Sequence, residues 1–218
     1  MILNQGLFQM KTQSQDLPPS EYYQKTRTAL ISSSLCSEPL LALLSLLPLI
    51  LRKDLQATIF QISFLTMVKP LSYLFSLYWS YATKERRDRL LPNVVWAGII
   101  SRLPLFLLPW VDGAWYLIGC IALYTVFFRG GGPAWMEILK LNIPSKDRGR
   151  VFSLASVLAY VEGSFLAIGL GALLDNHEGI WRWAFVASAV FGICGVAMQA
   201  RVPIRYKKFS PPPVKSVS

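Results

Sequence analysis

Six long apolar stretches, separated by short polar links, limit most strongly what this chain can fold into. A helix needs about 20 apolar residues to cross roughly 30 Å of hydrocarbon, and each stretch is about that long. The spans are predicted at residues 29–50, 57–81, 92–110, 114–135, 151–174 and 180–200. Strands of a transmembrane barrel would appear as segments of about ten residues with alternating hydropathy, and these continuous runs do not show that alternation. The sequence therefore predicts an all-α membrane protein with six transmembrane helices.

The composition and the flanking segments agree with this interpretation. Only 16% of the residues are charged and the mean hydropathy is +0.41, whereas a soluble domain carries about 25% charged residues. Residues 1–28 are polar and lack the apolar core and cleavage site of a secretory signal, so we expect an uncleaved cytoplasmic segment. Residues 201–218 are basic and rich in proline, which favours an extended cytoplasmic tail.

The net charge of +10 follows the predicted topology. Six spans place both termini on one side of the membrane, and Lys and Arg concentrate on the cytoplasmic side. The opposite side has only Arg52, Lys53 and Arg182. The basic residues on the side of the termini are Lys11, Lys25, Arg27, Lys84, Arg86, Arg87, Arg89, Lys140, Lys146, Arg148, Arg150, Arg201, Arg205, Lys207, Lys208 and Lys215. Both termini are therefore predicted to be cytoplasmic. No nucleic-acid partner is expected, because the clusters lie in separate short loops.

Signs of an enzyme, a cofactor or a metal site are lacking in the sequence. Cys36, Cys120 and Cys194 each fall within a span without paired spacing, and we interpret them as buried small apolar residues. His177 lies between acidic residues in a predicted loop, which is more typical of a solvated turn than of a zinc site. The glycine run at residues 129–135 begins inside a span and is interpreted as a packing or kink site. We expect no catalytic residue, cofactor or resident metal.

Five ionisable residues fall inside the predicted spans: Glu38, Lys69, Arg102, Arg129 and Glu162. Such groups cost about 2.5–3.5 kcal/mol each on insertion scales, so they are candidates for a substrate or ion path. At 1.5 Å per residue all except Arg129 fall near one depth, so they could line a shared cavity. The alternative is that they form internal ion pairs, Glu38 with Lys69 and Glu162 with Arg102, that only hold the bundle together. The surplus positive charge would suit an anionic substrate or a carboxylate from another subunit.

Prolines lie beside four of these charges. Pro39 and Pro70 follow Glu38 and Lys69 directly, Pro104 is close to Arg102, and Pro133 is close to Arg129. Each proline frees a backbone carbonyl and bends its helix, which membrane proteins tolerate where the backbone faces protein or a water-filled cavity. The last two spans instead carry glycines that allow close helix packing, at positions 163, 169, 171, 192 and 195. This pattern favours transporter-like helices over a passive anchor.

Three stretches of the chain resemble a known family. The segment PAWMEILKLNIPSKDRGRVFSL, residues 133–154, looks like the fourth helix of the major facilitator superfamily and the loop that follows it. GIWRWAFVASAVFG, residues 179–192, is similar to the start of the sixth helix of that family. SLYWSYATKERRDRL, residues 76–90, occupies the place of the signature loop between helices two and three, with Ser76 and Ser80 at its glycine and aspartate positions. The resemblance covers about residues 29–201.

The resemblance implies a fold and several residue roles. It implies the amino-terminal six-helix half of a secondary transporter, built as a 3+3 helix repeat. The basic residues of the two cytoplasmic loops would be gating candidates: Lys84, Arg86, Arg87, Arg148 and Arg150. Arg129 resembles the arginine of the fourth helix that is associated with proton coupling. The family has twelve spans with the site between two halves near mid-depth, so the resemblance implies a homodimer or a separately encoded second half.

Two hypotheses follow from the sequence. The first is a transporter, or half of one, that moves a small solute by alternating access in the cell membrane of a bacterium, with ion coupling through Glu38 or Glu162. The second is a scaffold without transport activity or the truncated remnant of a transporter. The second hypothesis predicts a monomer in detergent without stabilisation by substrate.

Overall fold

The computed structural model describes residues 18–84 and 89–204. Across these two ranges the chain is helical and has no strand. The helices are α2 (Pro19–Lys53), α3 (Ile59–Lys84), α4 (Leu90–Ile100), the 3₁₀ helix η2 (Leu103–Leu107), α5 (Ala114–Asn142), α6 (Ser145–Asn176) and α7 (Trp181–Ala200). This agrees with the predicted all-α class.

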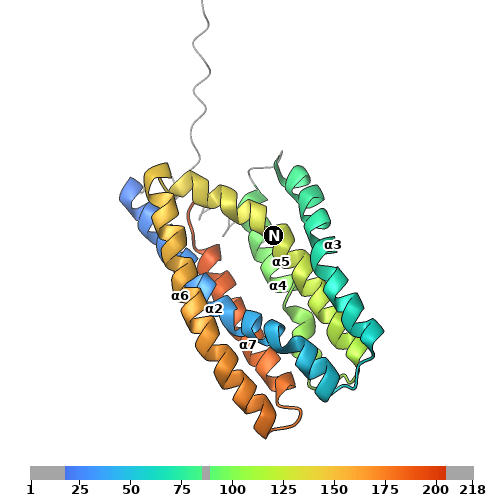
Figure 1. Cartoon of the computed structure of the whole chain (residues 1–218). Coiled ribbons are helices and arrows are strands. Elements are labelled where there is room, and N and C mark those ends of the chain that lie inside the picture. The colour runs from blue at the N-terminus through green and yellow to red at the C-terminus, as the bar shows by residue number, and fades with distance from the viewer. Residues whose placement is uncertain (1–17, 85–88, 205–218) are drawn as a thin grey trace, which may run out of the picture.

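The helices run up and down in one bundle (Figure 1). The start of α2 and the end of α7 lie at the same end of the bundle, which we call the terminal end; the other is the far end. α2 packs against α6 and α7, whereas α4 packs against α5 and α7, and α3 packs mainly against α5. The bundle therefore has two sides, α2 with α6 and α3 with α5, joined by α4 and α7.

Five segments among the described residues are long and apolar enough to cross a membrane: Ser20–Lys53, Leu90–Leu107, Ala114–Asn142, Ser145–Asn176 and Trp181–Ala200. They correspond to five of the six predicted spans. The sixth, α3, is not among these five; it has 26 residues, which span about 39 Å at 1.5 Å per residue, and it runs alongside α5. α3 runs opposite to α2 and α4, the helices before and after it in the chain, and parallel to α5, against which it packs, so it completes the up-and-down order.

The helices extend further at the terminal end than the apolar runs alone predicted. α2 begins at Pro19, with Pro18 as its N-cap, so residues 19–28 continue the first helix. Proline suits this position, because the first residues of a helix lack an intrahelical partner for their N–H groups. The first helix therefore begins about three turns before the predicted apolar span.

The third span is broken where the sequence places Arg102 and Pro104. α4 ends at Ile100 and η2 begins at Leu103. The backbone N–H of Arg102 bonds to the carbonyl of Ile99 at 3.0 Å instead of to that of Gly98, and Pro104 has no N–H for the carbonyl of Ile100. The freed carbonyl of Gly98 accepts hydrogen bonds from Ser101 Oγ at 2.9 Å and from Arg102 Nη1 at 2.8 Å. Side chains thus replace a missing backbone bond.

Side-chain packing closes both ends of the bundle. At the far end Lys53 pairs with Asp175 at 3.0 Å, and Arg182 pairs with Asp112. At the terminal end the buried Asn142 donates to Thr26 Oγ1 at 2.8 Å and to the carbonyl of Pro203 at 2.7 Å. The first contact joins the ends of α2 and α6, and the second joins the loop before α5 to the start of α7. The contacts of Asn142 tie α2, α5 and the segment after α7 together.

Glycines on several helices allow close helix contacts, as their positions in the sequence predicted. A Cβ on Gly130 would lie 3.0 Å from the Trp79 ring, and one on Gly131 would lie 3.2 Å from Ala97 Cβ. The glycine run of residues 129–135 is therefore a packing site, as predicted. Gly195 similarly lets α7 approach Cys36 on α2, whereas Gly169 and Gly171 have no neighbour within 4 Å of the added atom.

Candidate functional site

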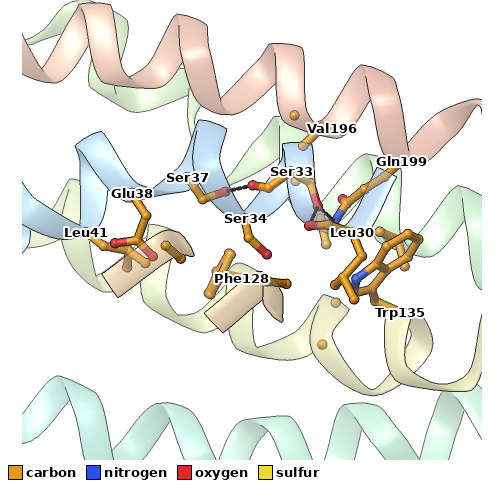
Figure 2. Close-up of a pocket in the computed structure, with 18 of the residues that line it drawn as sticks. Leu30, Ser33, Ser34, Ser37, Glu38, Leu41, Phe128, Trp135, Val196 and Gln199 are labelled. Atoms are coloured by element: carbon orange, nitrogen blue, oxygen red, sulfur yellow. Dashed lines mark hydrogen bonds between the residues drawn. The ribbon is translucent and has the colours of Figure 1, made fainter. Parts of the chain in front are cut away.

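A cavity of about 480 Å³ lies between α2, α4, α5, α6 and α7. One wall is the serine-rich face of α2, with Ser33, Ser34, Ser37 and Glu38, and Figure 2 shows these side chains in sequence along the helix. Gln199 of α7 closes this wall and donates a hydrogen bond to Ser33 Oγ at 3.2 Å. The cavity therefore has a continuous polar wall.

The opposite wall is apolar and aromatic. It consists of Phe127, Phe128 and Trp135 of α5, with Phe152 and Tyr160 of α6. Several lining side chains stay exposed, Phe128 at 40% and Tyr160 at 74%. The described chain alone therefore does not enclose the cavity, because residues that line it also face outward.

Arg102 is the most deeply buried cation that lines the cavity, with 2% of its surface exposed. Besides Gly98, its guanidinium contacts Ser101 Oγ at 3.4 Å and Ser37 Oγ at 3.5 Å, and lies 5.7 Å from the centre of the Tyr124 ring. Its Nε atom has no hydrogen-bond partner, and neither does the buried hydroxyl of Tyr124. Within residues 18–84 and 89–204 no carboxylate forms an ion pair with Arg102. A positive charge at the cavity wall is thus without a counter-ion.

Glu38 and Glu162 lie on facing helices. A Cβ added to Gly163 of α6 would lie 2.7 Å from Glu38 Oε2, so this glycine makes room for the carboxylate of α2. Glu162 is close enough to interact electrostatically with both Glu38 and Cys36. Its buried Oε2 has no hydrogen-bond partner. The sequence placed these two acids at one depth, and the structure brings them close to each other.

The two internal ion pairs offered as the alternative are not formed among the described residues. Neither Glu38 with Lys69 nor Glu162 with Arg102 is among the salt bridges. Lys69 is exposed on α3, which packs mainly on α5, and does not line the cavity. A shared depth does not fix which way a side chain points around its helix, so the pairing could not be predicted from depth alone.

Arg129 also faces away from the cavity. Its guanidinium carbon lies 4.1 Å from the centre of the Tyr73 ring, and its backbone carbonyl accepts a hydrogen bond from Ser76 Oγ at 3.0 Å. Both partners are on α3. In this conformation Arg129 therefore holds α3 against α5.

The gating candidates of the two loops at the terminal end differ in how they are placed. Arg148 Nη2 donates to the carbonyls of Lys140 and Ile143, both at 3.2 Å, and so caps the end of α5. Arg150 is exposed and lines a smaller pocket with Arg27 and Asp147. Lys84 is the last residue of α3, and Arg86 and Arg87 lie outside the described residues.

The described residues hold no group of three or more His, Cys, Asp or Glu that could bind a metal. All three cysteines are free thiols. Cys120 is buried as predicted, Cys36 is half-buried, and Cys194 is exposed, so the expectation of burial was wrong for Cys194. Cys194 shares an exposed apolar face of α7 with Phe191 and Met198.

Sequence reasoning missed most of the polar wall. Ser33, Ser34 and Ser37 belong to a group of serines directly before Glu38, in a span that is mostly apolar. Gln199 gave no comparable signal, because it lies near the end of the last span. The group of serines could have been found by asking where polar residues cluster beside an intramembrane charge.

The sequence of this chain matches the family described as Major Facilitator Superfamily over residues 31–216. The chain belongs to the Major Facilitator Superfamily. Members of this superfamily are transporters and not enzymes, and the match agrees with the apolar helices of the structure in giving a multi-pass membrane protein of the transporter class. No curated protein and no solved structure matches the chain.

Proposed function

We propose that this chain is one six-helix unit of a secondary transporter that moves a small solute by alternating access. The cavity beside α2 carries the proposal. It is large enough for a small solute, it has a polar wall with an intramembrane cation and carboxylate, and it lies between helices of a transporter family. Ionisable residues in a membrane interior are costly and mark transport paths.

A second six-helix unit would complete the site. Exposed lining residues such as Tyr160 and Phe128 show that the described residues leave the cavity open. In this family two six-helix halves, related by an axis along the membrane normal, enclose a site near mid-depth. We therefore propose that the chain acts as a homodimer or with a separately encoded partner, as the amino-terminal half with its 3+3 helix repeat.

We propose that the protein lies in the cell membrane. The terminal end of the bundle would then face the cytoplasm. The support is the excess of Lys and Arg in the loops and segments of that end. Coupling to an ion would use Glu38 on the cavity wall, with Glu162 beside it, because a carboxylate can bind and release a proton as access changes.

Thiol labelling from the two sides of the membrane tests alternating access without knowledge of the solute. In a background without Cys36, Cys120 and Cys194, Ser34→Cys places one thiol on the cavity wall. We expect an impermeant maleimide to label it in both right-side-out and inside-out vesicles. Labelling from one side only would contradict alternating access.

Two control positions fix the sidedness of that experiment. Lys25→Cys lies near the start of α2 and Asp175→Cys lies at the far end, and both residues are exposed. Each is expected to react in one vesicle orientation only, Lys25→Cys in inside-out vesicles. One-sided labelling at position 34, with both controls reacting as expected, would favour the scaffold or remnant.

A further inference from the structure

Two opposite charges of the cavity wall have no oppositely charged partner in the described part of the chain. Arg102 has no carboxylate partner, and its Nη2 makes only the 3.5 Å contact to Ser37. Glu38 forms no salt bridge and no hydrogen bond. An uncompensated charge in a low-dielectric site is energetically costly, so a ligand that matches both charges gains from both.

The geometry explains why the two do not pair with each other. Ser37, which contacts Arg102, and Glu38 are consecutive residues of α2, so their side chains diverge by about 100° around the helix axis. Arg102 reaches α2 from the side of α4 and α7, where Gly192 leaves room for its guanidinium. Glu38 turns toward Gly163 of α6. The two charges therefore approach the cavity from different sides.

We infer that this cavity binds a zwitterionic solute of the amino-acid class with a bulky apolar side chain, its carboxylate directed to Arg102 and its ammonium group to Glu38. The inference rests on the proposed function and names its substrate class. A monoanion would bring a second negative charge to Glu38, and a monocation a second positive charge to Arg102. A zwitterion satisfies both and leaves the net charge of the site unchanged, which is electrostatic complementarity.

The remaining walls fit the body of such a solute. The serines of α2 and Gln199 offer hydrogen-bond partners around the charged end. Phe128, Trp135 and Tyr160 offer an aromatic surface for an apolar side chain. Ligand pockets are typically mostly apolar, with a few polar groups that fix orientation, and their volumes run from about 300 to 1,000 Å³. The volume of about 480 Å³ falls within that range.

A series of four phenylalanine derivatives tests the charge requirement at nearly constant shape. The probes are phenylalanine (zwitterion), its methyl ester (cation), N-acetylphenylalanine (anion) and N-acetylphenylalanine amide (neutral). Binding to the full chain in lipid nanodiscs is measured by thermal stabilisation and by scintillation proximity. We expect phenylalanine to bind at least about tenfold more tightly than the other three, because each of them leaves a charge of the site unmatched. Preference for the ester, the anion or the amide, or binding of none, would overturn the inference.

Glu38→Gln is the decisive variant, with Glu178→Gln as its control. Glu178 is an exposed loop residue that does not line the cavity. We expect Glu38→Gln to weaken binding of phenylalanine about tenfold and to leave N-acetylphenylalanine unchanged or tighter, whereas Glu178→Gln changes neither. An equal loss for both ligands would contradict the assignment of the ammonium group to Glu38. Arg102→Gln is expected to weaken binding of phenylalanine and to leave binding of its methyl ester unchanged or tighter. If Arg102→Gln does not fold, the result for Glu38→Gln alone tests the inference.

Failure of this inference is distinguishable from failure of transport. Two-sided labelling at position 34 together with preference for a charge class other than the zwitterion would retain the transporter and overturn the substrate class. Selective binding of phenylalanine with one-sided labelling would retain the substrate class and overturn alternating access.

Discussion

Gly192 of α7 lies directly against the guanidinium of Arg102, so that a Cβ at position 192 would lie 3.0 Å from Arg102 Cζ and closer still to Nε. The absence of a side chain at one residue thus makes room for the buried charge of another. Both residues are buried, and α7 cannot move away from Arg102 without disturbing its contacts with α2 and α4.

Gly192→Ala is therefore expected to lower the free energy of unfolding by about 1–3 kcal/mol, the usual range for overpacking. Unfolding in mixed micelles by a denaturing detergent measures the change. Gly169→Ala is the matched control, because an added Cβ there meets nothing within 4 Å. A variant at position 192 as stable as the wild type would show that Arg102 can leave its place at little cost.

Asn142→Ala is expected to cost about 1–3 kcal/mol, because it leaves buried polar partners unsatisfied. The amide of Asn142 bonds Thr26, which is fully buried, and the carbonyl of Pro203. The same unfolding assay applies. Asn176→Ala is the control, since the Asn176 amide bonds a carbonyl of its own helix on the surface and its loss is expected to stay within about 0.5 kcal/mol. Similar losses at both positions would contradict this account.

Arg129 and Tyr73 are expected to be coupled by about 0.5–2 kcal/mol, the range for a cation over an aromatic ring. A double-mutant cycle of Arg129→Gln and Tyr73→Leu measures the coupling from unfolding free energies. Arg182→Gln combined with Tyr73→Leu serves as the control cycle, because Arg182 contacts Trp181 instead, and the two changes should be additive. Additivity in the first cycle would remove the structural role given to Arg129.

Arg148 and Arg150 separate a structural loop residue from a possible gating residue. Arg148→Gln removes a charged donor from two carbonyls at the end of α5, so we expect a loss of about 1.5–3 kcal/mol. Arg150→Gln changes an exposed side chain and is expected to stay within about 0.5 kcal/mol. A gating role for Arg150 would then appear as a changed rate of labelling at Ser34→Cys with unchanged stability. Destabilisation by Arg150→Gln would contradict the surface placement.

The sequence predicted the helices better than it predicted the site. Apolar length located the six helices, because crossing a bilayer demands about 20 apolar residues whatever the neighbours are. It missed the first turns of α2, where Pro19 continues the helix into polar residues. The free-energy cost of a charge in the hydrocarbon core identified Glu38 and Arg102 as candidates, and both line the cavity. Lys69 and Arg129 carry the same cost, but Lys69 lies on the exposed surface of α3 and Arg129 faces α3. The sequence could not predict this, because the orientation of a side chain about its helix axis depends on tertiary packing.

The break in the third span has a consequence for anyone who wishes to probe the charge at position 102. Arg102 Nη1 takes the bond to Gly98 that a backbone N–H makes in a continuous helix. Replacing Arg102 by a neutral residue therefore also removes a hydrogen bond that holds the backbone of its own segment. A substitution of Arg102 therefore changes the electrostatics and the backbone conformation together. A substitution of Ser37 is the better probe of the charge, because Ser37 contacts the guanidinium but is not part of the broken helical turn.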